Sequence, residues 1–198
     1  MSGQHATTVD ASQPGRTAVA ASAGAGVLAA AVGYALSYLL VGSEASENFE
    51  RVAEWKGVAW YHYSAHLVDV EAGGSIGGFS GTTTVNVIAE SGSASAQLLY
   101  LVPPVVLALT GAVLARRLGA RDLGDAVAAA APVAVGYGLV MGLGALVAEA
   151  GGEATVIGVE VGGSMAPQLI PAIVLAGVLY PLVFATAGAA LATAQGSR

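Results

Sequence analysis

The residues best suited to chemistry gather in one short stretch, EWKGVAWYHYSAHLVD, which runs from Glu54 to Asp69. It contains both tryptophans and two of the three histidines of the chain. His62 and His66 are four residues apart, so on a helix their side chains project from one side, about one turn apart. A structural zinc site needs four ligands, and the chain has no cysteine to add to these two. Metal binding by His62 and His66 is therefore a minor hypothesis, and no cofactor is expected.

The aromatic residues of this stretch support a second interpretation, an anchor at a membrane surface. At 100° per residue, the segment 47–67 forms a helix with Trp60 and Tyr63 inside its apolar stripe. His62 and His66 fall at the edge of that stripe, and tryptophan and tyrosine are enriched where hydrocarbon meets lipid headgroups. We therefore predict an amphipathic helix at the interface, with Trp60, Tyr63 and His66 as the candidate ligand-binding residues.

The composition of the chain excludes several classes of function. Hydrophobic residues make up 55% of the 198 residues and charged residues only 10%, whereas soluble domains have about 25% charged residues. The net charge of −6 argues against nucleic-acid binding, because phosphate contacts need lysine and arginine. The sequence has no phosphate-binding loop and no nucleophile elbow. We expect a membrane protein that is not an enzyme.

Four apolar segments are long enough to cross a bilayer, which takes about 20 helical residues. They are residues 18–41, 96–115, 126–148 and 168–192. The first run is too long for the apolar region of a typical signal peptide, which is the alternative at that position. The predicted fold class is an all-α membrane bundle of four transmembrane helices with a small external α+β cap.

The distribution of charge predicts the orientation of these helices. Arg116, Arg117 and Arg121 crowd the link 116–125, while most of the acidic residues fall in the loops 42–95 and 149–167. Positively charged loops face the cytoplasm. We therefore predict a multi-pass protein of the cell membrane with both termini cytoplasmic, in short tails of residues 1–17 and 193–198. The acidic, lysine-poor composition is typical of halophilic organisms.

The predicted external cap has its own secondary structure. Besides the helix 47–67, alternating apolar residues indicate short strands near 67–72, 82–90 and 155–161. Strands of this size do not bury an apolar face by themselves. We therefore expect the cap to cover part of the bundle.

The spans offer little for transport chemistry. They contain no aspartate, glutamate, lysine, arginine or histidine, although ion-coupled transporters often rely on such groups inside the membrane. Their prolines suggest packing kinks more strongly than a gate. Gly138 and Gly142 form a GxxxG pair, which lets helices approach closely within one bundle or between copies.

Two motifs resemble a known family. The outer motif fits at Trp55, Lys56, Trp60, Tyr63, Ala65 and His66, with Ala59 where the family has glycine, and the last span fits at Gly177, Tyr180 and Pro181. The resemblance is to haloarchaeal four-span membrane proteins of unknown function, which are loosely labelled transporters. It implies four spans and covers most of the chain after the N-terminal tail.

Three functions compete at this point. The leading hypothesis is an oligomeric or accessory subunit of a membrane or envelope complex, whose partners are the lipid bilayer and further copies or other membrane subunits. The alternatives are a small-solute transporter or channel, and an external metal- or ligand-binding cap.

Overall fold

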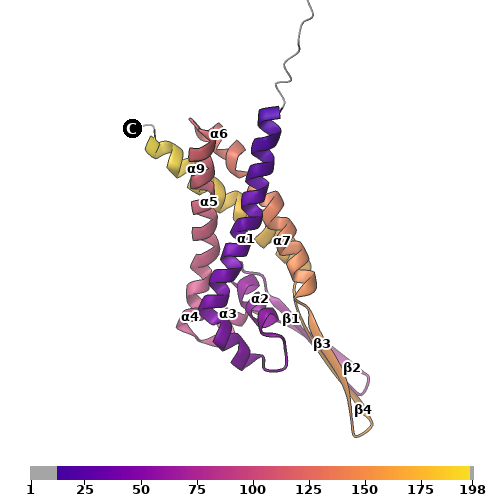
Figure 1. Ribbon diagram of the computed structural model, residues 1–198. Coiled ribbons are helices and arrows are strands. Elements are labelled where there is room, and N and C mark those ends of the chain that lie inside the picture. Colours follow the sequence, from indigo (N-terminus) through magenta and orange to yellow (C-terminus); the bar gives the residue numbers. More distant parts are fainter. Residues whose placement is uncertain (1–12, 197–198) are drawn as a thin grey trace, which may run out of the picture.

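Four helical segments form the body of the protein in a computed structural model that describes residues 13–196 (Figure 1). The first segment is the single helix α1 (Gln13–Asn48), and the second joins α4 (Ala94–Leu98), η1 (Leu99–Leu101) and α5 (Val102–Leu118). The third joins α6 (Leu123–Ala130) and α7 (Val133–Val147), and the fourth joins α8 (Leu169–Pro171), the π-helix η2 (Ala172–Leu179) and α9 (Tyr180–Gly196). Each segment is long and apolar enough to cross a membrane, which confirms the prediction of four such helices by length and composition.

The predicted tails are shorter in the structure than in the sequence interpretation. Helix α1 begins at Gln13, inside the predicted tail 1–17, and α9 continues to Gly196. The remaining predicted tail residues, 1–12 and 197–198, lie outside the described part of the chain.

Prolines mark the joints between the helical pieces. Pro103 lies in the first turn of α5 and Pro132 immediately precedes α7, where a missing backbone N–H costs little. Pro171 ends α8, and Pro181 is the second residue of α9. The prolines thus divide three spans into shorter helices.

Glycines let pairs of helices cross at backbone contact. A Cβ atom on Gly26 of α1 would meet the Val133 carbonyl oxygen, and one on Gly136 of α7 would meet the Ala23 carbonyl oxygen. Gly111 of α5 and Gly188 of α9 form a second such pair. Close packing through small residues is typical of helices that associate in lipid.

The predicted GxxxG pair also packs inside the chain. A Cβ on Gly138 would lie 3.0 Å from the Gly177 carbonyl oxygen, and one on Gly142 would lie 3.3 Å from Ile173 Cγ1. Both glycines of α7 therefore face η2 of the same molecule.

The helix predicted over 47–67 is two helices with a reversal between them. Helix α1 continues to Asn48, the chain turns over residues 49–53, and α2 runs from Glu54 to Ser64. Helix α2 then returns along α1. Periodicity of 100° per residue continues through such a break, so it could not indicate the change of direction.

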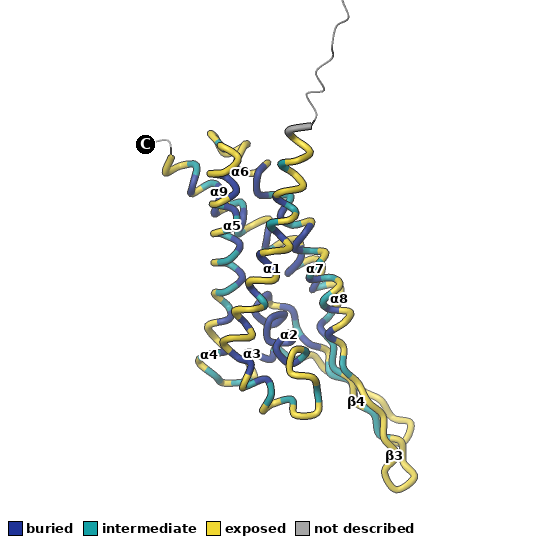
Figure 2. Tube along the Cα trace, viewed as in Figure 1, coloured by how far each residue is buried: buried dark blue, intermediate teal, exposed yellow. Residues whose placement is uncertain are grey.

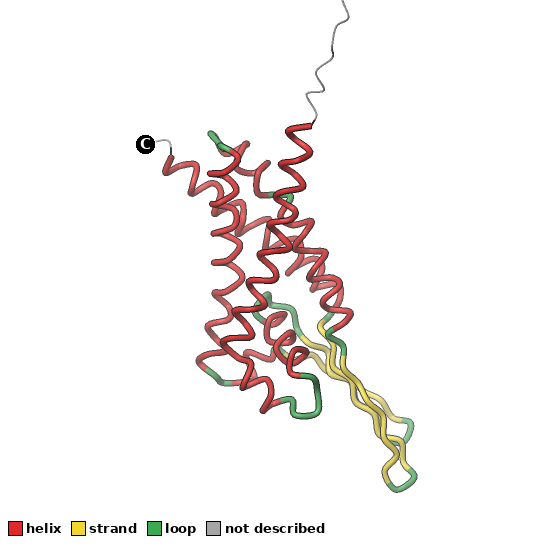
Figure 3. Tube along the Cα trace, viewed as in Figure 1, coloured by secondary structure: helices red, strands yellow, loops and turns green. Residues whose placement is uncertain are grey.

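A four-stranded antiparallel sheet leaves the helices at one end (Figure 3). Its strands are β1 (Val70–Ile76), β2 (Phe79–Val85), β3 (Ala150–Val156) and β4 (Val159–Pro167), in the order β2-β1-β4-β3. The short helix α3 (Val87–Ser91) follows β2. The predicted strand near 155–161 is in fact a hairpin, because Ile157 and Gly158 both have positive φ and form its turn.

The sheet does not cover the bundle as a cap, contrary to the prediction. It projects from the end opposite Gln13 and Gly196, and most of it is exposed (Figures 1 and 2). Only its base is packed, where Val70 joins a cluster with Trp60, Ile88 and Leu99. The buried helix α2, rather than the sheet, fills the space between the long helices.

The glycine crossings generate a prediction. Replacing Gly111 by Val should destabilise the protein by about 1–3 kcal/mol or more, because the added carbons overlap the backbone of α9. Thermal unfolding in detergent measures the effect. The matched control is Gly24→Val on α1, where a Cβ meets no atom within 4 Å. Equal unfolding temperatures for the two variants would contradict the crossing.

Candidate functional site

Helix α2 enters the interior of the bundle instead of lying at its surface. All residues from Gly57 to Ser64 are buried. Gly57 contacts Ala45 near the end of α1, whereas His62 reaches Ser37, farther back along the same helix. Glu44, the first charged residue after the first apolar run, lies seven residues beyond Ser37, which corresponds to about 10 Å of helix. The predicted amphipathic helix at a surface is therefore wrong: α2 is buried among the long helices and carries His62 to Ser37.

Protein groups satisfy both ring nitrogens of His66. Its Nδ1 lies 2.8 Å from the His62 carbonyl oxygen, which only accepts, so Nδ1 carries the proton. Its Nε2 lies 2.7 Å from the Tyr137 hydroxyl and accepts that hydrogen bond. The Tyr180 ring packs at 5.1 Å between centroids. His66 is thus a neutral imidazole that links the segment just after α2 to α7 and contacts α9.

His62 keeps one nitrogen without a partner. The Ser37 hydroxyl donates to the Gly33 carbonyl oxygen, so it accepts from His62 Nδ1, at 2.9 Å. His62 Nε2 is buried and has no hydrogen-bond partner. Its ring packs on that of His66 with 4.8 Å between centroids. The pair therefore exposes one lone pair to the interior of the bundle.

The other candidate residues bind backbone of the third span. Trp60 Nε1 donates to the Ala148 carbonyl oxygen at 3.0 Å, and the Tyr63 hydroxyl donates to the Met141 carbonyl oxygen. With the Tyr137 bond to His66, these contacts attach α2 along most of α7. On the other side, Tyr61 donates to Glu44 of α1 at 2.9 Å. The predicted ligand-binding residues Trp60, Tyr63 and His66 thus come together, with their polar atoms bonded to the protein.

Burial keeps both histidines neutral at physiological pH. It lowers the pKa of His66 to about 4, and it lowers the pKa of His62 well below 6.5, with a further contribution from the neighbouring His66.

Within residues 13–196, no three histidine, cysteine, aspartate or glutamate side chains gather as metal ligands. The cluster can accept a hydrogen bond or a proton at His62 Nε2, and it fastens α2 to two spans.

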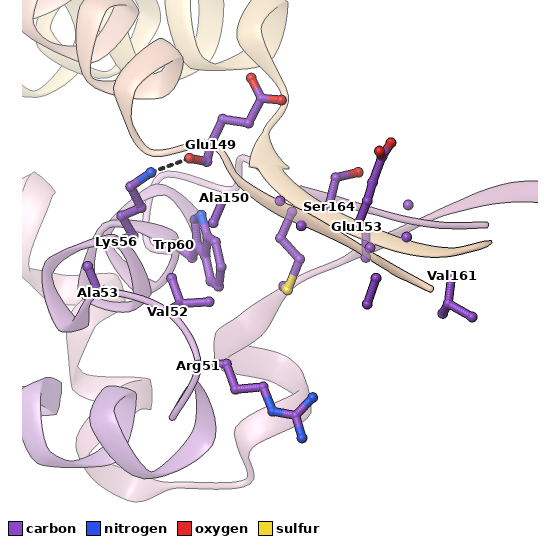
Figure 4. A pocket seen from close by; sticks show the side chains of 18 of the residues that line it. Arg51, Val52, Ala53, Lys56, Trp60, Glu149, Ala150, Glu153, Val161 and Ser164 are labelled. Atoms are coloured by element: carbon purple, nitrogen blue, oxygen red, sulfur yellow. Dashed lines mark hydrogen bonds between the residues drawn. The ribbon is translucent and has the colours of Figure 1, made fainter. Parts of the chain in front are cut away.

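A cavity of about 1360 Å³ lies where the sheet meets α2 (Figure 4). Trp60 and Val52 line its helical side, and Met165 of β4 lies across from them. Lys56 donates from Nζ to the Glu149 carbonyl oxygen, while Arg51 lies at the other end. Because of this cavity, α2 does not cover the whole sheet even near its base.

The sheet above this cavity has two chemically different faces. Directly paired residues of adjacent strands point to the same side, so the register assigns every side chain. The apolar face comprises Val70, Ala72, Ile76, Phe79, Val85, Ala150, Ala154, Val156, Val159, Val161 and Met165, with glycines, Thr83 and Pro167 at its other positions. The polar face comprises Glu71, Ser75, Ser80, Thr82, Thr84, Glu153, Thr155, Glu160 and Ser164, with glycines and Ala166 at its other positions. All three acids of the strands therefore lie on the polar face.

Sequence reasoning missed several residues of both features. It did not find Ser37 and Tyr137, which lie in the spans and bind the histidines. The only signal for them in the sequence was a single hydroxyl group within an otherwise apolar helix. The Gly-rich stretch 72–81 indicated a hairpin connection between the strands predicted near 67–72 and 82–90, but the strands extend through Ile76 and Phe79 to a turn at Gly77-Gly78. The Gly-Gly pair between apolar residues is the signal that could have placed that turn.

Acid should destabilise the protein through the histidine pair. The folded-state pKa values lie below 6.5, so the stabilisation is complete above pH 6.5 and is lost as the pH falls toward 4. For His66 the loss is about 2 kcal/mol at pH 5. We expect the unfolding temperature in detergent to fall between pH 7.5 and pH 5.

The control for this prediction is the double variant His62→Gln, His66→Gln. It should be less stable than the wild type at pH 7.5 but show a flatter pH dependence, because other titrating groups are common to both proteins. Identical slopes would show that the histidines are not buried in neutral form.

The sequence was compared with protein families, curated proteins and solved structures. No curated protein matched it, and no solved structure matched it. One family model matches residues 1–196, which is nearly the whole chain. The chain therefore belongs to this family, described as a family of unknown function (DUF7978).

Proposed function

We propose that this protein is an integral membrane protein that serves as a subunit of a membrane complex and attaches to its partner through the apolar face of its sheet. The observation that carries the proposal is the exposed apolar face. Phe79 is 82% exposed and Ile76 is 59% exposed, although both lie on the one face that has no charge. Contiguous apolar surface of this kind marks interaction sites.

The turn at the tip supports the same proposal. Ile157 is 98% exposed and has a φ of +52°. A β-branched residue rarely adopts this conformation, which glycine or asparagine adopts at lower cost. An isoleucine here is unfavourable for both solvation and backbone conformation in an isolated molecule. Contact with a partner accounts for its presence.

The distribution of charge supports an orientation for the complex. Arg116, Arg117 and Arg121 lie at the end of the bundle that carries Gln13 and Gly196, while the sheet at the other end carries acids. By the positive-inside rule, the termini are cytoplasmic and the sheet is external in this proposal. The attachment surface would then be outside the cell.

Polar substitutions at the tip test the attachment. The variant Ile76→Thr, Phe79→Thr, Ile157→Asn should lose at least tenfold in affinity for its partner while the helices keep their unfolding temperature within a few degrees, because these side chains contact no span. The complex is extracted from its own membrane in mild detergent, and its mass is measured by light scattering.

The matched control changes the polar face, with Thr82→Ser, Thr84→Ser and Thr155→Ser. It should retain the wild-type mass. A tip variant whose mass equals that of the wild type, or a wild-type protein that is monomeric and bound to nothing, would contradict the proposal.

A second candidate function, transport of a small solute, rests on His62. The four apolar runs contain no aspartate, glutamate, lysine, arginine or histidine, but α2 carries a histidine whose Nε2 has no partner and whose Nδ1 binds Ser37 of the first run. Ionisable residues at such depth often belong to ion or proton pathways. A transporter should give a proton or solute flux in proteoliposomes that falls at least tenfold in His62→Phe. Flux equal to that of empty vesicles would eliminate this candidate.

A further inference from the structure

In a single copy of the chain, three parts of the sheet lack a partner: its apolar face, its two edge strands and the cavity at its base. Its apolar face has no layer over it beyond the base, whereas a sheet normally buries one face against another element. Its two edge strands, β2 and β3, have unpaired backbone groups along their outer sides. The cavity beside Trp60 and Met165 continues the apolar face toward the bundle. One partner can cover all three parts if it is another sheet of the same kind.

Charge favours a second copy on the apolar face of the sheet over one on its polar face. The chain carries a net charge of −6, so a contact that brings acidic surfaces together is unfavourable. Glu71, Glu153 and Glu160 all point to the polar face, and β2 has no charged residue. Two copies therefore meet without opposing carboxylates when their apolar faces pack together.

The edges lack most of the devices that usually prevent sheet extension, since Glu153 on β3 is their one charged residue. Lysine, proline and bulges commonly protect edge strands, but β2 reads FSGTTTV and β3 reads AGGEATV. Both edges have seven residues, and both pair without interruption on their inner sides. The two edges therefore match in length and are free to pair.

Strand direction determines which edges match. β1 and β3 run from the bundle to the tip, and β2 and β4 run back. Two copies with the same orientation in one membrane are related by an axis along the membrane normal, which preserves these directions. A β2 edge is then antiparallel to the β3 edge of the other copy but parallel to its β2 edge. Antiparallel pairing continues the existing hydrogen-bond pattern.

The size of the contact is adequate for a stable dimer. Seven residues per strand and four strands give a face of about 24 Å by about 19 Å, or about 450 Å² in plane. Two such faces and the paired edges bury about 1,000 Å² in total, which reaches the range of specific interfaces. An isologous two-fold dimer also satisfies both edges at once.

We propose that two copies of this chain join through their sheets, with β2 of each copy pairing with β3 of the other and the apolar faces enclosed between them. The product is a closed sheet of eight strands, a size at which side chains fill the interior. The proposal rests on the proposed function, since it names the partner of the attachment surface. Phe79 at the tip of each β2 then lies beside the tip end of β3 of the other copy, which precedes Ile157.

Disulfide cross-linking in native membranes tests the pairing, because the chain has no cysteine of its own. One chain carries Ser80→Cys on β2 and a differently tagged chain carries Thr155→Cys on β3. Within one copy these strands are separated by β1 and β4, about 14 Å apart, which is too far for a disulfide. Cells expressing both chains should form a mixed dimer on mild oxidation. The second pair Thr82→Cys with Glu153→Cys samples a neighbouring register.

The matched control expresses each single-cysteine chain alone, and neither should cross-link to itself. Self-linking of Ser80→Cys would overturn the edge assignment, as would a dimer by mass without any mixed disulfide. A complex with a different protein and no second copy would overturn the dimer but leave the proposed function intact. A lone monomer would overturn both.

Discussion

The structure depends on the insertion of α2 between α1 and α7. This helix carries the side chains of Trp60, Tyr61 and Tyr63 into an interior whose other buried apolar residues are mostly alanine. Each such side chain has a specific backbone or side-chain partner, as Trp60 has in the Ala148 carbonyl and Tyr63 in the Met141 carbonyl. Burying the Trp60 and Tyr63 donors without a partner would cost several kcal/mol each, so these bonds determine where α2 can lie.

The position of the sheet follows from this insertion. Helix α2 ends inside the bundle, and Leu67 takes a left-handed backbone conformation just beyond that end. Strand β1 then starts at the buried Val70, next to Pro167 of β4. The sheet is therefore fixed at its base by the same packing that holds α2. Its free end extends from the helices and presents one apolar face.

The long elements of the fold could be predicted from the sequence because their signals are local. The lengths of the apolar runs give four helices, and the alternation of Val159 and Val161 gives a strand with these residues on one face. The depth of α2 could not be predicted, because a helical wheel shows only which residues share a face. His62 appeared to lie at the edge of a stripe, whereas its ring binds Ser37, 25 residues earlier in the chain.

In the candidate site too, the spacing of nearby residues could be predicted, whereas contacts between residues far apart in the sequence could not. The histidine spacing placed His62 and His66 together on one side of a helix, and their rings do pack on each other. The roles of Tyr137 and Tyr180 depend on contacts across the bundle, which neither spacing nor composition records. The direction in which the sheet projects could not be predicted either, because it depends on the space between the long helices that α2 occupies.

The most direct test of this account is the ¹⁵N NMR spectrum of the imidazole rings in histidine-labelled protein in lipid nanodiscs. If α2 is inserted, His66 gives a protonated Nδ1 and an unprotonated Nε2 that accepts a hydrogen bond, with no titration between pH 8 and pH 5.5. The Tyr137→Phe variant should then shift the His66 Nε2 resonance selectively. A His66 ring that titrates near its ordinary pKa of 6.5 would show that α2 lies in contact with water and would contradict the account.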